Sequence, residues 1–518
     1  MSLSMTKDAN PSTAAVAKKS LSHFAIGKVL AVLIGITTLL LLVRSLSRDD
    51  YGVYITLFAA FEILQLAASP GAYAIAFRYL PELRPAGGGV GLQALVHRVT
   101  AYRIGTLVLC GAALYIAAPA LADLAGAAYT TNVVRLFALM LCFEGTARFI
   151  DVQFESLLQQ GRAQASALLR NGSKLVGLLL VGGAGQHEVS LEMWLSIEVA
   201  TSALGAVVST GLLLHYGSKR GREAVAQTLH MPAMARQLRF SVPTYFSQVL
   251  YLLTGTEMVK LLVSRLLGVQ AIAAFGFASA LSATIQKYLP SYLLIGWVRP
   301  LFISARSGGR STADLVNLAG TVIKINVLML APITTALLVA GEPLLALLSG
   351  GRMTDGIGYL YFFVFLLFIQ SIRAVISLLG FTMEIGSGGL VATVVSVVGI
   401  ALGVAGYPSF GVWSLCGGLV VSELSWGAVM AGYLKASGMS FRLPLFSLAK
   451  FAAAIALSAA TLHALGIERL ASGGLLGLCC ALAAAVAVCL ALCAALRPFS
   501  SDERSLINKL LPVKVFVW

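Results

Sequence analysis

Charged side chains interrupt the long apolar runs of this chain, at depths where they could hold ions or anionic groups. A charge at the centre of a bilayer costs about 2.5–3.5 kcal/mol on insertion scales. Eleven such charges would together exceed the ~5–15 kcal/mol net stability of a typical fold. They must therefore pair, reach the membrane surface or line an aqueous cavity. The positions are Lys28, Glu62, Glu144, Arg148, Glu198, Glu257, Lys260, Lys287, Lys324, Arg373 and Glu423.

Four of these charges are the hardest to explain by local structure, and two of them, Lys324 and Arg373, have no acid three or four residues away. Glu62 lies ten residues beyond Gly52, which is about 15 Å at 1.5 Å per residue and so near the middle of a ~30 Å core. Glu423 lies at a similar depth, and Lys324 and Arg373 complete the group. They favour a polar cavity, with cations for an anionic substrate and carboxylates for coupling to H⁺ or Na⁺. Interhelical structural salt bridges are the alternative.

Other charges have a local explanation, and catalytic motifs are missing. Glu144 and Arg148 lie four residues apart on one helical face and can neutralise each other. Lys287 can extend along its helix to the membrane surface. The sequence contains no Gly-rich phosphate loop, nucleophile elbow or metal-ligand cluster. We therefore expect no catalytic residues, no bound metal and no cofactor other than a coupling ion.

The composition places these charges in a polytopic membrane protein. The chain has 518 residues, of which 58% are hydrophobic and 11% are charged, whereas soluble domains are about 25% charged. The mean hydropathy is +0.87. These values exclude a soluble enzyme, a disordered scaffold and a nucleic-acid-binding protein.

The apolar runs predict an all-α polytopic membrane protein with about fourteen transmembrane helices. The runs are continuous and lack the alternating pattern of a barrel strand, which favours helices. The predicted spans are 24–46, 52–77, 102–122, 131–151, 166–184, 191–215, 241–264, 269–297, 315–340, 357–380, 387–406, 410–434, 446–466 and 473–496.

The distribution of Lys and Arg predicts the orientation. With the N-terminal tail in the cytoplasm, the cytoplasmic segments hold 25 basic residues and the opposite side holds six. This asymmetry follows the positive-inside rule. We therefore expect both termini in the cytoplasm, and the net charge of +15 to reflect topology.

A weak internal repeat divides the chain into two halves. At an offset of 221 residues, Arg44 aligns with Arg265, and Tyr54 aligns with Phe275. The offset covers six helices, so the halves share one topology, as in transporters with parallel repeats. We expect the polar cavity between these halves. The predicted parts are a tail at 1–20, an N-terminal six-helix bundle at 21–216, a cytoplasmic linker at 217–240, a C-terminal six-helix bundle at 241–436, two additional helices at 445–496 and a tail at 497–518.

Two prolines fall inside predicted spans. Pro70 lies in the second span and Pro290 in the eighth. Proline within a helix removes a hydrogen bond and kinks the helix. The two residues are candidate hinges for a rocking motion, and static bends for packing are the alternative.

Several short motifs resemble one family. The stretch LSRDDYGVY at 46–54 and the stretch RYLPE at 78–82 resemble the opening of bacterial polysaccharide flippases, which are Wzx-like members of the multidrug/oligosaccharidyl-lipid/polysaccharide (MOP) exporter superfamily. Ser47 stands where the family usually has glycine. GEPLL at 341–345 and PSFGVW at 408–413 also resemble the family. The similarity runs over about residues 21–500.

The resemblance implies two six-helix bundles plus two extra helices, working by alternating access. The implied function is transfer of an undecaprenyl-pyrophosphate-linked oligosaccharide across the bacterial inner membrane, for O-antigen, surface or exopolysaccharide synthesis. Implied partners are membrane lipids, a polysaccharide polymerase and export machinery, and no nucleic acid. By residue type and depth, the candidate pyrophosphate-binding residues are Lys287, Lys324, Arg373 and Arg148. The candidate residues for coupling to H⁺ or Na⁺ are Glu62, Glu423, Glu144 and Glu198.

Two other functions stay open. A multidrug or small-solute cation antiporter of the same superfamily would have the same fold, but it would favour a cavity dominated by acids. A membrane glycan polymerase or glycosyltransferase is disfavoured because the predicted outside loops are short.

Overall fold

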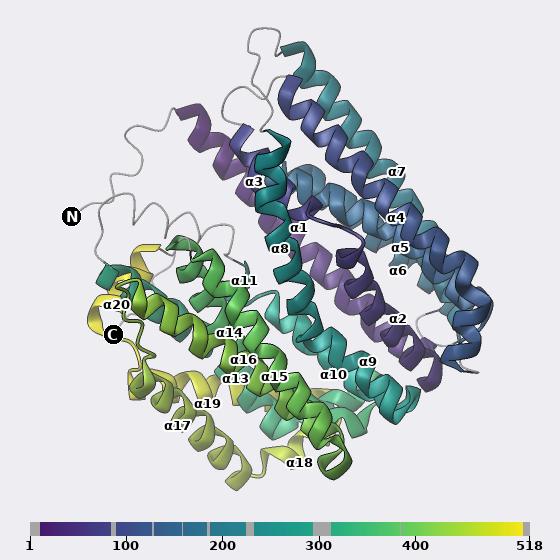
Figure 1. Ribbon diagram of the computed structural model, residues 1–518. Coiled ribbons are helices and arrows are strands. Elements are labelled where there is room, and N and C mark those ends of the chain that lie inside the picture. The colour runs from purple at the N-terminus through teal and green to yellow at the C-terminus, as the bar shows by residue number, and fades with distance from the viewer. Residues whose placement is uncertain are drawn as a thin grey trace. The chain divides into compact units, whose positions relative to one another are not determined.

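The structure is a computed structural model (Figure 1) that describes residues 11–83, 90–126, 129–157, 159–183, 187–223, 233–293, 312–383 and 385–510. This part of the chain contains helices and turns and no β-strand. The tails at 1–10 and 511–518, the middle of the predicted linker and the end of the eighth predicted span lie outside the described residues, as does the side chain of Lys28.

The predicted all-α membrane class is confirmed. Each of the fourteen predicted spans overlaps a helix or a broken pair of helices. Within the described ranges, nine helices are long and apolar enough to cross a membrane, and a tenth candidate is a pair bent by 61°.

The chain divides into two compact units. Unit 1 comprises residues 1–253 and 260–273, and unit 2 comprises residues 254–259 and 274–518. The boundaries of the predicted domains stay a prediction.

Unit 1 is built around α5, which packs against α4, α6 and α7, while α1 packs on α6 and α3 packs on α4 and α8. Two of its apolar clusters centre on large buried rings, Phe61 in one and Phe149 in the other. The helices are α1 (Pro11–Ser45), α2 (Arg48–Ala67), α3 (Ala72–Leu83), α4 (Val90–Ala125), α5 (Thr131–Ser156), α6 (Gln160–Gly182), α7 (Leu191–Glu223) and α8 (Met234–Leu253).

The motif at 46–54 forms the start of α2. The Ser47 side chain accepts a hydrogen bond from the backbone N–H of Asp50 at 3.0 Å, which satisfies one of the free donors of the first turn. Asp49 and Asp50 lie in the first turn, where their negative charges stabilise the helix by interacting with the positive end of its dipole. A Cβ on Gly52 would clash with the carbonyl oxygen of Val269, so glycine is needed there for close packing.

The second predicted span is broken at its proline. α2 ends at Ala67, α3 begins at Ala72, and the two helices are bent by 61°. Gly71 adopts φ 74, a conformation that glycine adopts most easily. Pro70 lies in this break rather than within a helix, so the predicted position in a helix interior is wrong, although the bend is present. Pro290 likewise opens α11 (Pro290–Leu293), because a proline fits the first turn of a helix. Their role as hinges stays a prediction.

Unit 2 is built around the long α13, which packs against α14, α17 and α19. α13 is kinked at Ala340, whose φ is −136 and ψ is 24, because the ring of Pro343 disrupts the preceding turn. Further helices are α14 (Ile357–Thr382), α15 (Gly386–Phe410), α16 (Val412–Ala436), α17 (Leu445–Ala464), α18 (Ile467–Ala471), α19 (Leu475–Leu496) and α20 (Ser501–Leu510), with α13 spanning Thr312–Ser349 and the short η1 spanning Thr354–Gly356. α9 (Thr256–Leu267) and α10 (Val269–Gln286) contribute residues to both units.

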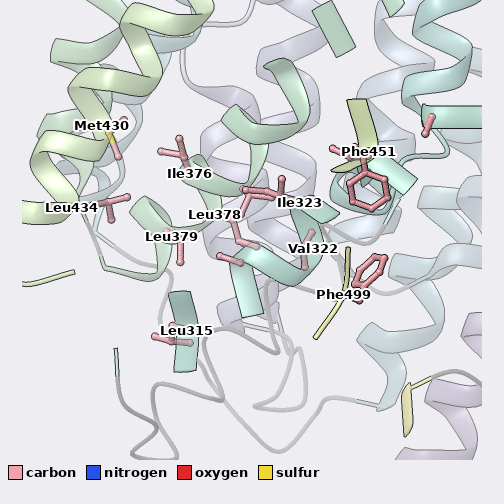
Figure 2. Packing of buried hydrophobic residues seen from close by; sticks show 14 of the residues in the cluster. Leu315, Val322, Ile323, Ile376, Leu378, Leu379, Met430, Leu434, Phe451 and Phe499 are labelled. Atoms are coloured by element: carbon pink, nitrogen blue, oxygen red, sulfur yellow. The ribbon is translucent and has the colours of Figure 1, made fainter. Parts of the chain in front are cut away.

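One apolar cluster joins the helices of unit 2. It includes Leu315 and Ile323 of α13, Ile376 of α14 and Phe451 of α17, as Figure 2 shows. Phe499, which precedes α20, also belongs to it. This core therefore ties the last helices of the chain to α13.

Candidate functional site

Four helices of unit 1 bring charged residues together. Arg148 of α5 donates to Glu144 one turn earlier at 2.8 Å and to Glu62 of α2 at 2.6 Å. The predicted pairing of Glu144 with Arg148 is therefore present. Arg148 also lies over the rings of Phe61 and Phe58, at 4.8 and 5.6 Å from their centroids. These rings support the guanidinium by cation–π contact.

Glu144 is the centre of the network. Its carboxylate lies 3.2 Å from Arg170 Nε and 3.4 Å from Lys174 Nζ, both on α6. The hydroxyl of Ser202 on α7 donates to it at 2.8 Å. The Glu144 side chain is only 4% exposed, so its charge depends on these partners.

Glu198 of α7 extends the network on one side. Lys174 Nζ lies 3.3 Å from its carboxylate, so this lysine is shared between Glu144 and Glu198. The phenol of Tyr54 on α2 donates to Glu198 at 3.2 Å.

Glu62 extends the network on the other side. The amide of Gln65 donates to Glu62 at 2.9 Å, and Tyr73 donates to the Gln65 carbonyl oxygen at 3.3 Å. Hydrogen bonds and ion pairs thus run without interruption from Tyr54 to Tyr73. This path connects the N-terminal part of α2, where Tyr54 lies, with the start of α3, where Tyr73 lies.

The ion-paired groups of this network carry one more acid than base. The carboxylates are Glu62, Glu144, Glu198 and Asp151, which accepts from Arg170 at 3.0 Å, and the cations are Arg148, Arg170 and Lys174. Buried charge is costly without compensation, and the fully buried guanidinium of Arg103, which lies over Tyr73 at one end of the network, is a further cation beside these groups. Within the described residues, no group of three or more His, Cys, Asp or Glu could hold a metal ion.

Accessibility differs along the network. The side chains of Arg148 and Glu62 are 29% and 26% exposed, whereas that of Glu198 is 3% exposed. Arg148 is therefore the cation of this network that an anionic ligand could reach most easily, and Glu198 lies in its closed interior.

Unit 2 contains a simpler ion pair. Arg373 of α14 donates to Glu423 of α16 at 2.5 Å, and the Gln370 amide donates to the same carboxylate at 3.3 Å. The Arg373 guanidinium lies 4.4 Å from the ring centroid of Trp426. Arg373, a candidate for pyrophosphate binding, and Glu423, a candidate for ion coupling, thus neutralise each other.

The two remaining lysine candidates lie elsewhere in unit 2. Lys324 of α13 pairs with Glu503 of α20, with Nζ at 2.8 and 2.9 Å from the two carboxylate oxygens. Lys287 is exposed and lies in the turn after α10.

Four members of these clusters were not among the sequence candidates: Arg170, Lys174, Asp151 and Glu503. Arg170 and Lys174 lie within the predicted span 166–184, and the 25 basic residues assigned to the cytoplasm include both of them and Arg103. All three side chains are buried in the structure, so burial among helices, rather than exposure in a loop, describes them. The four-residue spacing of Arg170 and Lys174 was the available signal. Glu503 lies in a predicted tail, and nothing local in the sequence pointed to it.

Arg103 lies at the Tyr73 end of the network. The residue is fully buried, and its guanidinium lies over the rings of Tyr73 and Phe149, at 5.4 and 6.0 Å. Cation–π contact with these rings supports the charge.

Comparison with known proteins gives similarity at the level of structure. No protein-family model and no curated protein sequence matches the chain. The structure is similar to the lipid II flippase MurJ in an inward closed conformation, with a TM-score of 0.66 and 11% identity, over 93% of this chain and 99% of that one.

Multidrug transporters are also similar. An inward-facing multidrug resistance MATE family transporter of the MOP superfamily matches with a TM-score of 0.55 and 15% identity, over 81% of this chain and 99% of that one. A mutant of the Vibrio cholerae MATE transporter VcmN matches with a TM-score of 0.54 and 12% identity, over 84% and 100%.

The extent of the matches separates the two kinds of neighbour. The match to MurJ covers 93% of 518 residues, or about 482, but only 444 residues precede α17. It must therefore include part of the C-terminal helices. The matches to the two MATE transporters cover at most 84% of the chain, or about 435 residues. Matches of this length can lie entirely before α17, so they need not include the C-terminal helices. The chain thus has the fold shared by the transporters and flippases of the MOP superfamily.

Proposed function

We propose that this protein is a Wzx-like flippase that moves an undecaprenyl-pyrophosphate-linked oligosaccharide across the bacterial inner membrane by alternating access. The observation that carries this proposal is the match to a lipid-linked flippase over 93% of the chain, including part of the C-terminal helices. The sequence motifs at 46–54 and 78–82 support the polysaccharide branch of the superfamily. The product would serve O-antigen, surface or exopolysaccharide synthesis together with a polymerase and export machinery.

Arg148 is the proposed contact for the pyrophosphate. It is the most accessible cation of the unit 1 network, and a guanidinium binds phosphate oxygens through two parallel hydrogen bonds. Glu62 at 2.6 Å is the group that phosphate would displace. Arg373 is a secondary candidate because Glu423 and Trp426 already engage it, and exposed Lys287 is a candidate for the entering substrate.

Glu198 is the proposed site of ion coupling. The ion-paired groups have one more acid than base, Glu198 is as deeply buried as Glu144, and its cationic neighbour Lys174 is shared with Glu144. A proton on Glu198 would neutralise the excess. Na⁺ is the alternative coupling ion, and Glu62, Glu144 and Glu423 would then position the charges around the coupling site.

A multidrug or small-solute cation antiporter is the second candidate. The matches to MATE transporters and the excess of acid in the unit 1 network favour it. The structural neighbours described above are transporters and flippases rather than enzymes, so a glycan polymerase is not proposed.

Leaflet translocation in proteoliposomes distinguishes these functions. Vesicles would carry a fluorescent polyprenyl-pyrophosphate oligosaccharide, and a membrane-impermeant quencher would report the fraction that stays protected. A flippase removes the protected fraction, and Arg148→Gln should slow this removal at least tenfold. Arg239→Gln, which changes an exposed arginine on α8, is the matched control.

Uptake of a fluorescent organic cation by the same vesicles tests the second candidate. Cation uptake driven by a proton or Na⁺ gradient, without loss of the protected glycan lipid, would overturn the flippase proposal.

A further inference from the structure

The carboxylate of Glu503 occupies a set of donors on α13 and at the start of α20. Lys324 Nζ lies 2.8 and 2.9 Å from its two oxygens. The hydroxyl of Thr321, one turn before Lys324, lies 3.5 Å from Oε1. The backbone N–H of Ser500 donates to Oε2 at 2.8 Å. An ammonium, a hydroxyl and an amide therefore converge on one anionic group.

Glu503 also determines how α20 begins. Its own backbone N–H donates to the Ser500 hydroxyl at 3.3 Å, while its side chain accepts from the Ser500 N–H. This reciprocal pair is a capping box, which stabilises the first turn of a helix. One carboxylate thus caps α20 and fastens it to α13.

The rest of the α20 attachment is apolar and small. Phe499, Glu503 and Ile507 follow one another at four-residue spacing, so they lie along one side of the segment. Phe499 and Ile507 are each 5% exposed and belong to the cluster around α13. The Phe499 ring packs edge-on against Phe451 with centroids 5.9 Å apart, as Figure 2 shows. Among the side chains that the structure describes, Phe499, Ile507 and the Lys324–Glu503 pair help to fasten this helix of ten residues, which is too short to persist alone in water.

Lys324 lies twelve residues after Thr312, the first residue of α13, and only 8% of it is exposed. With Glu503 in place, the ammonium is therefore almost completely shielded from solvent.

We propose that Lys324 and Thr321 form an anion-binding site that Glu503 fills as a built-in ligand, and that a phosphate group takes its place when α20 detaches. Carboxylate and phosphate oxygens accept hydrogen bonds from the same donors, and lysine binds phosphate as a point charge. Breaking a buried pair by removing one partner is costly, so an anion that binds Lys324 would lower the cost of detaching α20. Phosphate binding at Lys324 then releases α20 from α13. This proposal does not depend on which substrate the protein carries.

Phosphate-dependent stability of the purified full chain tests the site. Wild-type protein should show a smaller change in melting temperature on adding pyrophosphate than the Glu503→Gln variant, because pyrophosphate must displace Glu503 to bind. Glu503→Gln keeps the side-chain oxygen for the cap but empties the site of charge, so pyrophosphate should raise its melting temperature by several degrees. Lys324→Met in the Glu503→Gln background should abolish that rise. Lys435→Met in the same background, which changes an exposed lysine of α16, should leave it intact.

Proteolysis of the wild-type chain supplies a second measurement that needs no variant. Trypsin cleavage after Arg504, within α20, should be slow in buffer and about tenfold faster with pyrophosphate, because displacement of a charge-assisted contact releases the helix. The charge-exchanged variant Lys324→Glu/Glu503→Lys retains a pair but presents no anion site, so pyrophosphate should not change its cleavage.

Two lipid conditions identify the source of the phosphate. Nanodiscs with anionic phosphatidylglycerol should accelerate the cleavage relative to phosphatidylcholine if lipid headgroups bind, whereas a response to pyrophosphate alone indicates a soluble or substrate phosphate. Folded Glu503→Gln protein that gains no phosphate response, together with wild-type cleavage that phosphate does not change, would overturn the proposal and leave Glu503 as a structural partner of Lys324.

Discussion

The two units carry an arginine and a glutamate at the same spacing but connect them differently. Arg148 and Glu198 in unit 1 are 50 residues apart, as are Arg373 and Glu423 in unit 2. In unit 2 the two side chains meet directly at 2.5 Å. In unit 1, Glu144 and Lys174 stand between them. Unit 2 thus holds a direct pair of opposite charges, whereas the ion-paired groups of unit 1 form an extended network with one more acid than base.

The helix that precedes the glutamate explains the difference. In unit 1 this helix is α6, which supplies Arg170 and Lys174 to the network. In unit 2 it is α15, where Gly399 lies against α16 so closely that a Cβ would clash with the backbone nitrogen of Ser422. This packing leaves no room for a charged side chain between the helices. We infer that unit 1 is adapted to gain and lose a charge and that unit 2 is adapted to keep its pair.

The largest loss of stability is expected for Glu144→Gln. This change removes the anion that Arg148, Arg170 and Lys174 share, and breaking a buried pair by removing one partner costs about 3–5 kcal/mol. Thermal unfolding of the purified protein in detergent measures the effect. A loss below about 1 kcal/mol would mean that water already screens the network and that its burial does not govern stability.

A smaller loss is expected for Glu423→Gln. Arg373 keeps its contact with Trp426, and the new amide still accepts a hydrogen bond, so we expect about 2–3 kcal/mol. The double variant Arg373→Met/Glu423→Leu should recover most of this loss, because replacing both partners of a buried pair is often neutral. If the double variant did not recover stability, Arg373 or Glu423 would have to make stabilising contacts beyond the ion pair between them.

The packing difference predicts a loss of about 1–3 kcal/mol for Gly399→Ala, the usual cost of overpacking. Gly417→Ala on α16 is the matched control, since a Cβ there meets nothing within 4 Å, and it should stabilise the helix by about 0.5–1 kcal/mol. Equal melting temperatures for the two variants would contradict the close contact of α15 and α16.

The smallest change in stability is expected for Glu198→Gln. The amide oxygen can still accept from Tyr54, and loss of the excess negative charge offsets loss of the contact with Lys174, so the net change should be under about 1 kcal/mol. The effect on transport should be large, because the group proposed to carry the proton is gone. A destabilisation as large as that of Glu144→Gln would place Glu198 among the structural partners instead.

The helices of the predicted spans were predictable from sequence because they are continuous apolar runs, and the break near Pro70 was predictable from one residue. The polar helix α20 lies in the predicted tail at 497–518 and had no such signal. The charge partners were not predictable either. Arg373 and Glu423 lie 50 residues apart and Lys324 and Glu503 lie 179 apart, so only the packing of different helices brings them together. Arg170 and Lys174 were not recognised as charge partners because a positive charge at the edge of an apolar run has the same pattern whether it faces the cytoplasm or a buried carboxylate.

The central claim is that Arg148 contacts the substrate while Glu198 couples its movement to an ion. Translocation of a polyprenyl-pyrophosphate oligosaccharide in proteoliposomes, with and without an imposed proton or Na⁺ gradient, tests both parts in one experiment. The account predicts that wild-type protein responds to a gradient, that Arg148→Gln is slow under every condition, and that Glu198→Gln translocates at one rate with or without the gradient. A full gradient response in Glu198→Gln, or wild-type rates in Arg148→Gln, would contradict it.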